Sequence, residues 1–224
     1  MVRRRLLPDR RGAGRVEPPP RRRVSFALSR EAIADRLGDP AALARAAPTF
    51  SDDAEAAAQS GRLRDAAVLV PIVWHDATPS ILLTLRSARL TAHAGQVAFP
   101  GGRLEPGETA EAAALREAAE EVGLDPRLPV VAGHLPEHLT GTGFRVTPVV
   151  AFLDPPLTLT PDPGEVAAIF ELPLATVLDP AAPERRQAEF RGRMREFWVW
   201  PHPEHLIWGA TATMLVSLAR ILRD

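Results

Sequence analysis

The chain of 224 residues contains no cysteine, which excludes disulfide bonds, thiolate zinc sites, cysteine-ligated iron–sulfur clusters and a cysteine nucleophile. It also contains no lysine, so all 27 basic residues are arginine. No apolar run approaches the ~18 residues of a membrane span, and no signal-peptide core follows the basic N-terminus. We therefore expect a cytoplasmic protein without a membrane partner.

The net charge is −1, but the charge is spread unevenly along the chain. Residues 1–23 hold nine arginines against Asp9 and Glu17, a net charge of +7, which leaves −8 for the remainder. This segment also contains the run Pro18–Pro20, and such a composition cannot build a packed core. We predict a disordered Arg/Pro-rich tail and interpret it as idle; the alternative is a tether to nucleic acid or to an anionic lipid surface.

Residues 24–63 are expected to form a helical N-terminal extension. Ser29 is suited to cap a first helix, Asp39-Pro40 to open a second and Ser51–Asp53 to open a third. These residue types favour helix starts because their side chains accept hydrogen bonds from the first free backbone N–H groups.

Residues 64–224 mix strands with a few helices and lack regular βαβ spacing, which predicts an α/β (α+β) fold built as an α/β/α sandwich with a mixed sheet. Pro71 interrupts the first strand, so we expect a bulge or an edge position there. The expected strands are Ala66–Trp74, Ser80–Arg86, Val130–Leu135 and Arg145–Leu153, and the expected last helix is Ala210–Leu222.

The segment Gly102–Leu124 reads GRLEPGETAEAAALREAAEEVGL. Thr109 is suited to cap a helix that runs to Val122, and Gly123 to end it in the left-handed conformation. At about 100° per residue, Glu117, Glu120 and Glu121 share one arc of this helix. The apolar stripe expected on the opposite side, toward the core, consists of Ala112, Leu115, Ala118, Ala119 and Val122.

The three glutamates repel one another, and Arg116, with Glu108 in reach, neutralises only part of this charge. A hard divalent cation would neutralise the rest, and ligands limited to oxygen favour Mg²⁺ or Mn²⁺ over zinc. Mg²⁺ also binds substrate phosphates, which points to a phosphate ester or anhydride as substrate. The alternative is a solvated acidic helix face, but the tight turn Phe99–Gly102 lets backbone approach a ligand closely and favours a site.

These residues resemble the signature box of the Nudix hydrolases. The matching positions are Gly102, Glu108, Arg116, Glu117, Ala118, Glu120, Glu121, Gly123 and Leu124, with Ala118 small for its apolar position.

Upstream, Leu82–Gly102 is similar to the motif of the coenzyme A pyrophosphatase branch, except that Thr91 stands where that motif has arginine. Downstream, Phe144–Val150 and Ile207–Leu215 are similar to the tail of the same branch. The resemblance spans roughly residues 64–222 and implies a Nudix-type α/β/α sandwich for residues 64–224.

The resemblance also implies roles for individual residues. Mg²⁺ or Mn²⁺ is expected on Glu117, Glu120 and Glu121, with the carbonyl of Gly102 as a further ligand. A carboxylate, Glu120 or Glu165, is expected to take the proton from water. The residues expected to steady the box are Arg116 and Glu108, and those expected to bind substrate are Arg86, Ser87, Arg89, Gly101 and Gly102.

The implied reaction is hydrolysis of the pyrophosphate bond in coenzyme A or an acyl derivative, giving 3′,5′-ADP and a 4′-phosphopantetheine product. Thr91 leaves open another nucleoside diphosphate derivative, such as ADP-ribose or NADH. A non-catalytic nucleotide-binding regulator is the second alternative, and the complete carboxylate set argues against it. We expect no nucleic-acid partner, interpret His93 as structural, and expect a homodimer from family habit and the aromatic group Phe197, Trp198, Trp200 and Trp208.

Overall fold

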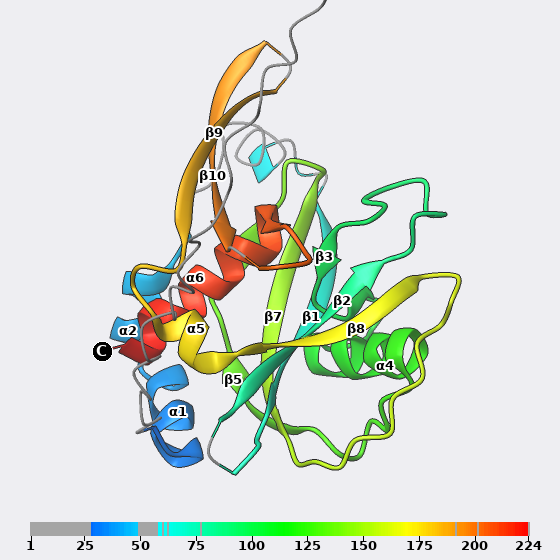
Figure 1. The fold of residues 1–224 in the computed structure, drawn as a ribbon, viewed down its shortest axis with the longest axis vertical. Coiled ribbons are helices and arrows are strands. Elements are labelled where there is room, and N and C mark those ends of the chain that lie inside the picture. Colours follow the sequence, from blue (N-terminus) through cyan, green and yellow to red (C-terminus); the bar gives the residue numbers. More distant parts are fainter. Residues whose placement is uncertain are drawn as a thin grey trace, which may run out of the picture.

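The computed structural model describes residues 28–48, 58–59, 61, 63–76, 78–190, 192–200 and 202–223. These residues form a mixed β-sheet with helices on both faces and a smaller sheet that extends from one end (Figure 1). The predicted tail at residues 1–23 and the predicted helix start at Ser51–Asp53 lie outside the described residues.

The large sheet is organised around β1 (Arg64–Val73), which pairs in parallel with β7 (Phe144–Leu153) along its whole length. On its other side, β1 pairs antiparallel first with β4 (Gly101–Arg103) and then with β2 (Ser80–Arg86). The predicted mixed sheet is therefore confirmed. The outer strands are β3 (Val97–Ala98) and β8 (Val166–Pro173) beside β2, and β5 (Val130–His134) and β6 (His138–Leu139) beside β7.

Pro71 lies inside β1, which is an interior strand and not the edge strand that we predicted as one option. The N–H of Leu69 donates to the carbonyl of Pro100 at 2.8 Å, on the side of β1 that faces β4 and β2. Backbone groups two residues apart along a strand point the same way, so the nitrogen of Pro71 faces that side too. It falls between the pairing with β4, which ends at Val68, and the pairing with β2, which begins at Ile72. The sheet tolerates this proline because neither neighbour needs its missing N–H.

Helices cover both faces of the sheet, which confirms the sandwich (Figure 1). Helix α4 (Ala110–Val122) packs on one face. The opposite face is covered by α1 (Arg30–Leu37), α2 (Pro40–Ala46), α5 (Leu174–Leu178) and α6 (Gly209–Arg223). The caps predicted for the first two helices are confirmed: Ser29 Oγ accepts from the Ala32 N–H, and the Asp39 carboxylate accepts from the Ala41 N–H. Ile33 of α1 is fully buried in the same core as α6, so these helices are part of the sandwich.

The smaller sheet consists of β9 (Glu184–Phe190), β10 (Arg193–Trp200) and β11 (Ile207–Trp208). Trp200 is fully buried and its indole N–H donates to the carbonyl of Ala212 in α6 at 3.1 Å. Phe197 and Trp208 form an edge-to-face pair, and Trp208 remains 39% exposed. The C-terminal aromatic group is thus divided between core and surface. Within the described residues, no helix has the length and apolar composition needed to cross a membrane.

Helix α4 buries a different face from the predicted one. Its buried residues lie on an arc turned by about 100° toward the glutamates. Ala112 of the predicted stripe is exposed, whereas Glu121 lies within the buried arc. The cause is β4, whose Gly101 and Gly102 bring no side chains to the interface and leave room for carboxylates. The buried residues of α4 are Ala113, Ala114, Ala118, Glu121 and Val122.

Candidate active site

The glutamate-bearing helix begins and ends where the sequence predicts. Thr109 is the N-cap, and its hydroxyl oxygen accepts a hydrogen bond from the Ala112 N–H at 3.2 Å. Gly123 ends the helix with a φ of +68°, a left-handed conformation that glycine adopts without a Cβ clash. These caps fix the helical register, and the register determines which glutamates face the sheet.

Gly101 and Gly102 of β4 form the surface on which the glutamates rest. A Cβ at Gly102 would lie 2.3 Å from Glu117 Oε1, so the carboxylate occupies the space that a side chain would fill. A Cβ at Gly101 would lie 2.4 Å from the Ala67 carbonyl oxygen, which is backbone and cannot move aside. The fold therefore requires glycine at position 101, and the placement of the Glu117 carboxylate requires glycine at position 102.

Glu121 is the most buried of the acidic side chains, with 4% exposure. Its Oε2 accepts from the Gly101 N–H at 3.2 Å, and its Oε1 lies 3.5 Å from the Arg86 guanidinium. Burial raises the pKa of Glu121 to about 7; the contacts with Gly101 and Arg86 oppose this shift, and the charges of Glu165 and Glu117 add to it. A buried carboxyl so close to other acids is destabilised when ionised, and a bound cation would relieve it.

Glu117 shares this environment. Burial raises the pKa of its carboxyl, the hydrogen bond from Arg116 opposes the shift, and the charges of Glu120 and Glu165 reinforce it. Glu165, which immediately precedes β8, therefore acts electrostatically on both the partly buried Glu117 and the buried Glu121. Its backbone carbonyl accepts from the Ser87 N–H at 2.7 Å, which fixes the start of β8 beside the end of β2.

Arg116 contacts several residues of the Nudix-like box. Its predicted contact with Glu108 is present. Its Nε and Nη2 donate to the two oxygens of Glu108 at 2.9 and 3.0 Å. Its Nη1 donates to Glu117 at 3.0 Å and to Glu120 at 3.2 Å, and Nη2 also donates to the carbonyl of Arg103 at 3.0 Å. The hydrogen bonds from Arg116, and a further one from the Glu105 N–H, lower the pKa of Glu108. The arginine holds the helix, the preceding loop and β4 in one arrangement.

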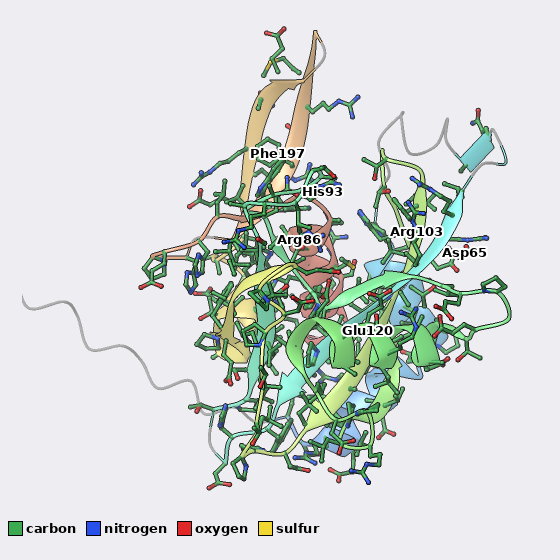
Figure 2. The ribbon with its side chains drawn as sticks, turned by 90° about the vertical axis from the view of Figure 1, so that its right-hand side faces the viewer. Asp65, Arg86, His93, Arg103, Glu120 and Phe197 are labelled. Carbon is green, nitrogen blue, oxygen red and sulfur yellow. The ribbon has the colours of Figure 1, made fainter. Side chains whose placement is uncertain are left out.

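Glu120 is the accessible member of the cluster. Its side chain is 62% exposed, and Figure 2 shows it on the outer side of α4. Glu120 lies four residues after Arg116 on the helix, and it is the most exposed of the glutamates that Arg116 contacts. Of the three glutamates, it has the greatest freedom to turn toward a ligand.

Of the predicted substrate-binding residues, Arg86 lies in the site and Arg89 lies on the surface. Arg86 Nε is buried and has no hydrogen-bond partner among the described residues. The side chain of Ser87 is buried, and its Oγ accepts from the Arg89 N–H at 3.4 Å. His93 has a left-handed φ of +58° and its ring bonds to Gln96 at 2.8 Å, which fits the structural interpretation.

The donor set fits a hard divalent cation by its chemistry, since it offers crowded carboxylates and backbone oxygen without sulfur. In the described part of the chain, no three acidic or histidine side chains come together as a metal-binding group. Two of the predicted ligands are instead paired with an arginine, since Arg116 Nη1 donates to both Glu117 and Glu120. Arg103, whose carbonyl accepts from Arg116 at 3.0 Å, is not predicted from the sequence, and its position directly after Gly102 is the signal that could have found it.

The sequence profile of the NUDIX domain matches residues 63–191. The chain belongs to the Nudix hydrolases. The protein named Uncharacterized Nudix hydrolase NudL from Photorhabdus laumondii is 44% identical over 158 residues, 70% of this chain and 84% of the relative. Its counterpart from Citrobacter koseri is 44% identical over 157 residues, again 70% of this chain and 81% of the relative.

Two solved structures are also similar to this Nudix hydrolase. The C. elegans Ap4A hydrolase binary complex has a TM-score of 0.45 at 23% identity and covers 53% of this chain and 86% of that chain. DR0079 from Deinococcus radiodurans has a TM-score of 0.46 at 16% identity and covers 68% of this chain and 80% of that chain. As a Nudix hydrolase, the protein is a pyrophosphohydrolase of a family that binds nucleotide substrates and generally uses divalent metal ions.

Proposed function

We propose that this Nudix hydrolase cleaves the pyrophosphate bond of coenzyme A or acyl-coenzyme A, releasing 3′,5′-ADP and a 4′-phosphopantetheine product. The observation that supports this most directly concerns Arg86. This arginine belongs to the segment that resembles the coenzyme A pyrophosphatase branch, and its guanidinium reaches Glu121 of the Nudix box. Its buried Nε has no partner among the described residues, so the side chain is suited to hold a substrate phosphate beside the box.

The metal that we propose is Mg²⁺ or Mn²⁺, held by Glu117, Glu120 and Glu121 with the Gly102 carbonyl. Support comes from burial of Glu121 and from the raised pKa values of Glu117 and Glu121, since both carboxyls gain from a cation. When bound, such an ion neutralises pyrophosphate charge and lowers the pKa of a coordinated water.

Arg116 and Glu108 act as positioning residues in this proposal. Their two-point contact fixes the start of α4 relative to β4, and the same guanidinium restrains Glu117 and Glu120. The pKa of Arg116 is raised by its hydrogen bonds with Glu108 and Glu117, so its charge persists at every working pH. A fixed register of the helix keeps the ligand carboxylates in place while substrate binds.

A carboxylate takes the proton from the attacking water, and two residues qualify. Glu120 is exposed and lies on the same helix as the partly buried Glu117 and the buried Glu121. Glu165 comes from the start of β8 and acts electrostatically on both Glu117 and Glu121. Arg86, Ser87, Arg89, Gly101 and Gly102 complete the proposed site as substrate-binding residues.

The test is a product assay on the purified full chain. Coenzyme A, ADP-ribose, NADH and a nucleoside triphosphate are incubated separately with Mg²⁺, with Mn²⁺ and with chelator, and products are identified by mass spectrometry. Metal-dependent release of 3′,5′-ADP, well above turnover of the other substrates, is the expected result. Glu117→Gln is expected to abolish it, whereas the matched control Glu111→Gln, in the first turn of the same helix, is expected to retain it.

Preferred hydrolysis of ADP-ribose or NADH would retain the metal site and discard coenzyme A as substrate. Binding of these nucleotides without turnover of any would favour the non-catalytic regulator. The homodimer predicted from the sequence stays a prediction, and the elution volume of the purified protein on size exclusion tests it.

A further inference from the structure

Two arginines from different strands stack on one phenylalanine at the edge of the proposed site. The guanidinium carbon of Arg64 in β1 lies 4.0 Å from the ring centroid of Phe144 in β7. The guanidinium carbon of Arg103 in β4 lies 5.4 Å from the same centroid. Arg64 also donates to the carbonyl of Thr142 at 3.2 Å, so its guanidinium is held from two sides. The ring attracts both guanidiniums and so offsets part of the repulsion between their positive charges.

The sheet register places all three side chains on the same face. Arg64 is opposite Phe144, and Ala66 is opposite both Val146 and Arg103. Paired residues share a face and neighbours along a strand alternate. Ala66 and Val146 belong to the core on the side away from α4, so Arg64, Phe144 and Arg103 lie on that side as well.

This pair of arginines has no acidic counterpart in the described part of the chain. The nearest acid on the paired strands, Asp65, alternates to the other face and is bound by Arg145 at 2.8 Å. Arg64 and Arg103 are both exposed, and no carboxylate among the described residues lies within ion-pair distance of either. Among the described residues, the cluster therefore presents positive charge to solvent without a paired carboxylate.

The cluster is joined directly to the Nudix box. Arg103 follows Gly102, against which the Glu117 carboxylate rests, and the Arg103 carbonyl accepts from Arg116. In the view of Figure 2, Arg86 and Arg103 both lie above the helix that carries Glu120. Because the cluster and the glutamates lie on opposite faces of the narrow strand β4, a substrate whose anhydride lies at the glutamates would reach the two guanidiniums around the edge of that strand.

We propose that Arg103 and Arg64, placed by Phe144, bind a phosphate monoester of the substrate that is distinct from the anhydride being cleaved. Two guanidiniums supply paired donors and the charge that a phosphate dianion requires. The inference rests on the proposed function, in which this group is the 3′-phosphate of coenzyme A. The cluster would then select nucleotides that carry an extra phosphate over those that lack one.

The kinetic test compares coenzyme A with 3′-dephospho-coenzyme A. The wild-type protein is expected to prefer coenzyme A by about 10- to 100-fold in kcat/KM. Arg103→Met and Arg64→Met, which keep an apolar stem, are expected to remove most of this preference by raising KM for coenzyme A. Their kcat/KM for 3′-dephospho-coenzyme A should stay near the wild-type value, since that substrate lacks the group they bind.

The matched control is Arg145→Met, because Arg145 follows Phe144 but lies on the other face and is paired with Asp65. It is expected to keep the wild-type preference. Phe144→Leu is expected to weaken the preference without removing either charge. Equal turnover of both substrates by the wild type, or an equal loss on both substrates in Arg103→Met, would overturn the assignment.

A binding measurement separates this inference from the proposed function. Thermal shifts are recorded for the wild type and Arg103→Met with 3′,5′-ADP and with 5′-AMP, without turnover. Greater stabilisation of the wild type by 3′,5′-ADP, lost in the variant, supports the cluster even if coenzyme A is not cleaved. Equal stabilisation by both nucleotides contradicts it even if coenzyme A is cleaved.

Discussion

Arg116 binds both carboxylate oxygens of Glu108 across eight residues of sequence, at 2.9 and 3.0 Å. The pair joins the loop before α4 to the helix itself, and its remaining donors reach Glu117, Glu120 and the Arg103 carbonyl. Only a planar group with several fixed donors can make all of these contacts at once.

Arg116→Lys should therefore lower kcat by about 10- to 100-fold, because an ammonium cannot reproduce the two-point contact. Helix content by circular dichroism should be unchanged, since α4 keeps its caps and its buried face. The matched control is Arg127→Lys, an exposed arginine paired locally with Asp125. Equal activity of both variants would show that the fork of Arg116 is dispensable.

Adding a single methyl group should lower activity at Gly102 and stability at Gly101. In Gly102→Ala the new Cβ meets the end of the flexible Glu117 side chain, so the fold survives and the carboxylate is displaced. Activity should fall by at least about 100-fold with little change in Tm. In Gly101→Ala the Cβ meets the backbone of Ala67 and Val68, so stability should fall by about 1–3 kcal/mol or more. Similar Tm losses in both variants would contradict this division, which differential scanning fluorimetry measures.

Glu121→Gln should raise Tm in metal-free buffer while removing activity. The folded-state pKa of Glu121 is about 7, above the usual 4.5, so the wild type loses stability as pH rises from 4.5 to 7. The gain from the substitution should therefore be largest above pH 7, about 3 kcal/mol at most, and smallest below pH 4.5. Melting curves across this range test it, and a Tm gain that does not grow with pH would argue against the raised pKa.

The proton acceptor can be identified by comparing Glu165→Gln with Glu120→Gln. Loss of a general base should lower kcat by about 10²- to 10⁴-fold without weakening Mn²⁺ binding. Loss of a metal ligand should weaken Mn²⁺ binding itself, which calorimetry on the full chain measures. We expect one of the two variants to lose kcat with Mn²⁺ binding intact, and the other to bind Mn²⁺ more weakly. Weakened Mn²⁺ binding in both would place both residues on the metal.

His138 should make stability fall in mild acid. Burial lowers its pKa to about 4, so between pH 6.5 and 4 the unfolded chain takes up a proton that the folded chain does not. Stability should drop by about 3 kcal/mol over this range from His138 alone. Urea unfolding at several pH values should show a shallower drop in His138→Gln. Parallel curves for variant and wild type would assign the acid sensitivity to other groups.

Elements with local causes could be predicted from the amino-acid sequence. Thr109 and Gly123 set the ends of α4, Ser29 and Asp39 those of α1 and α2, and the box spacing placed Glu108 within reach of Arg116. Capping and helical spacing act within a few residues, so the chain alone specifies them.

The buried face of α4, by contrast, depends on how the helix packs against β4. Alanine occurs nearly all round the helix, so composition does not mark the inner face, and Gly101 and Gly102 admit Glu121 into it. Likewise, Arg86 and Glu165 meet the box through the pairing of β2 with β8, and Arg64 meets Arg103 through the register of β1 with β4 and β7. Strand register joins residues distant in sequence, and its hydrogen bonds form between backbones that no local pattern identifies.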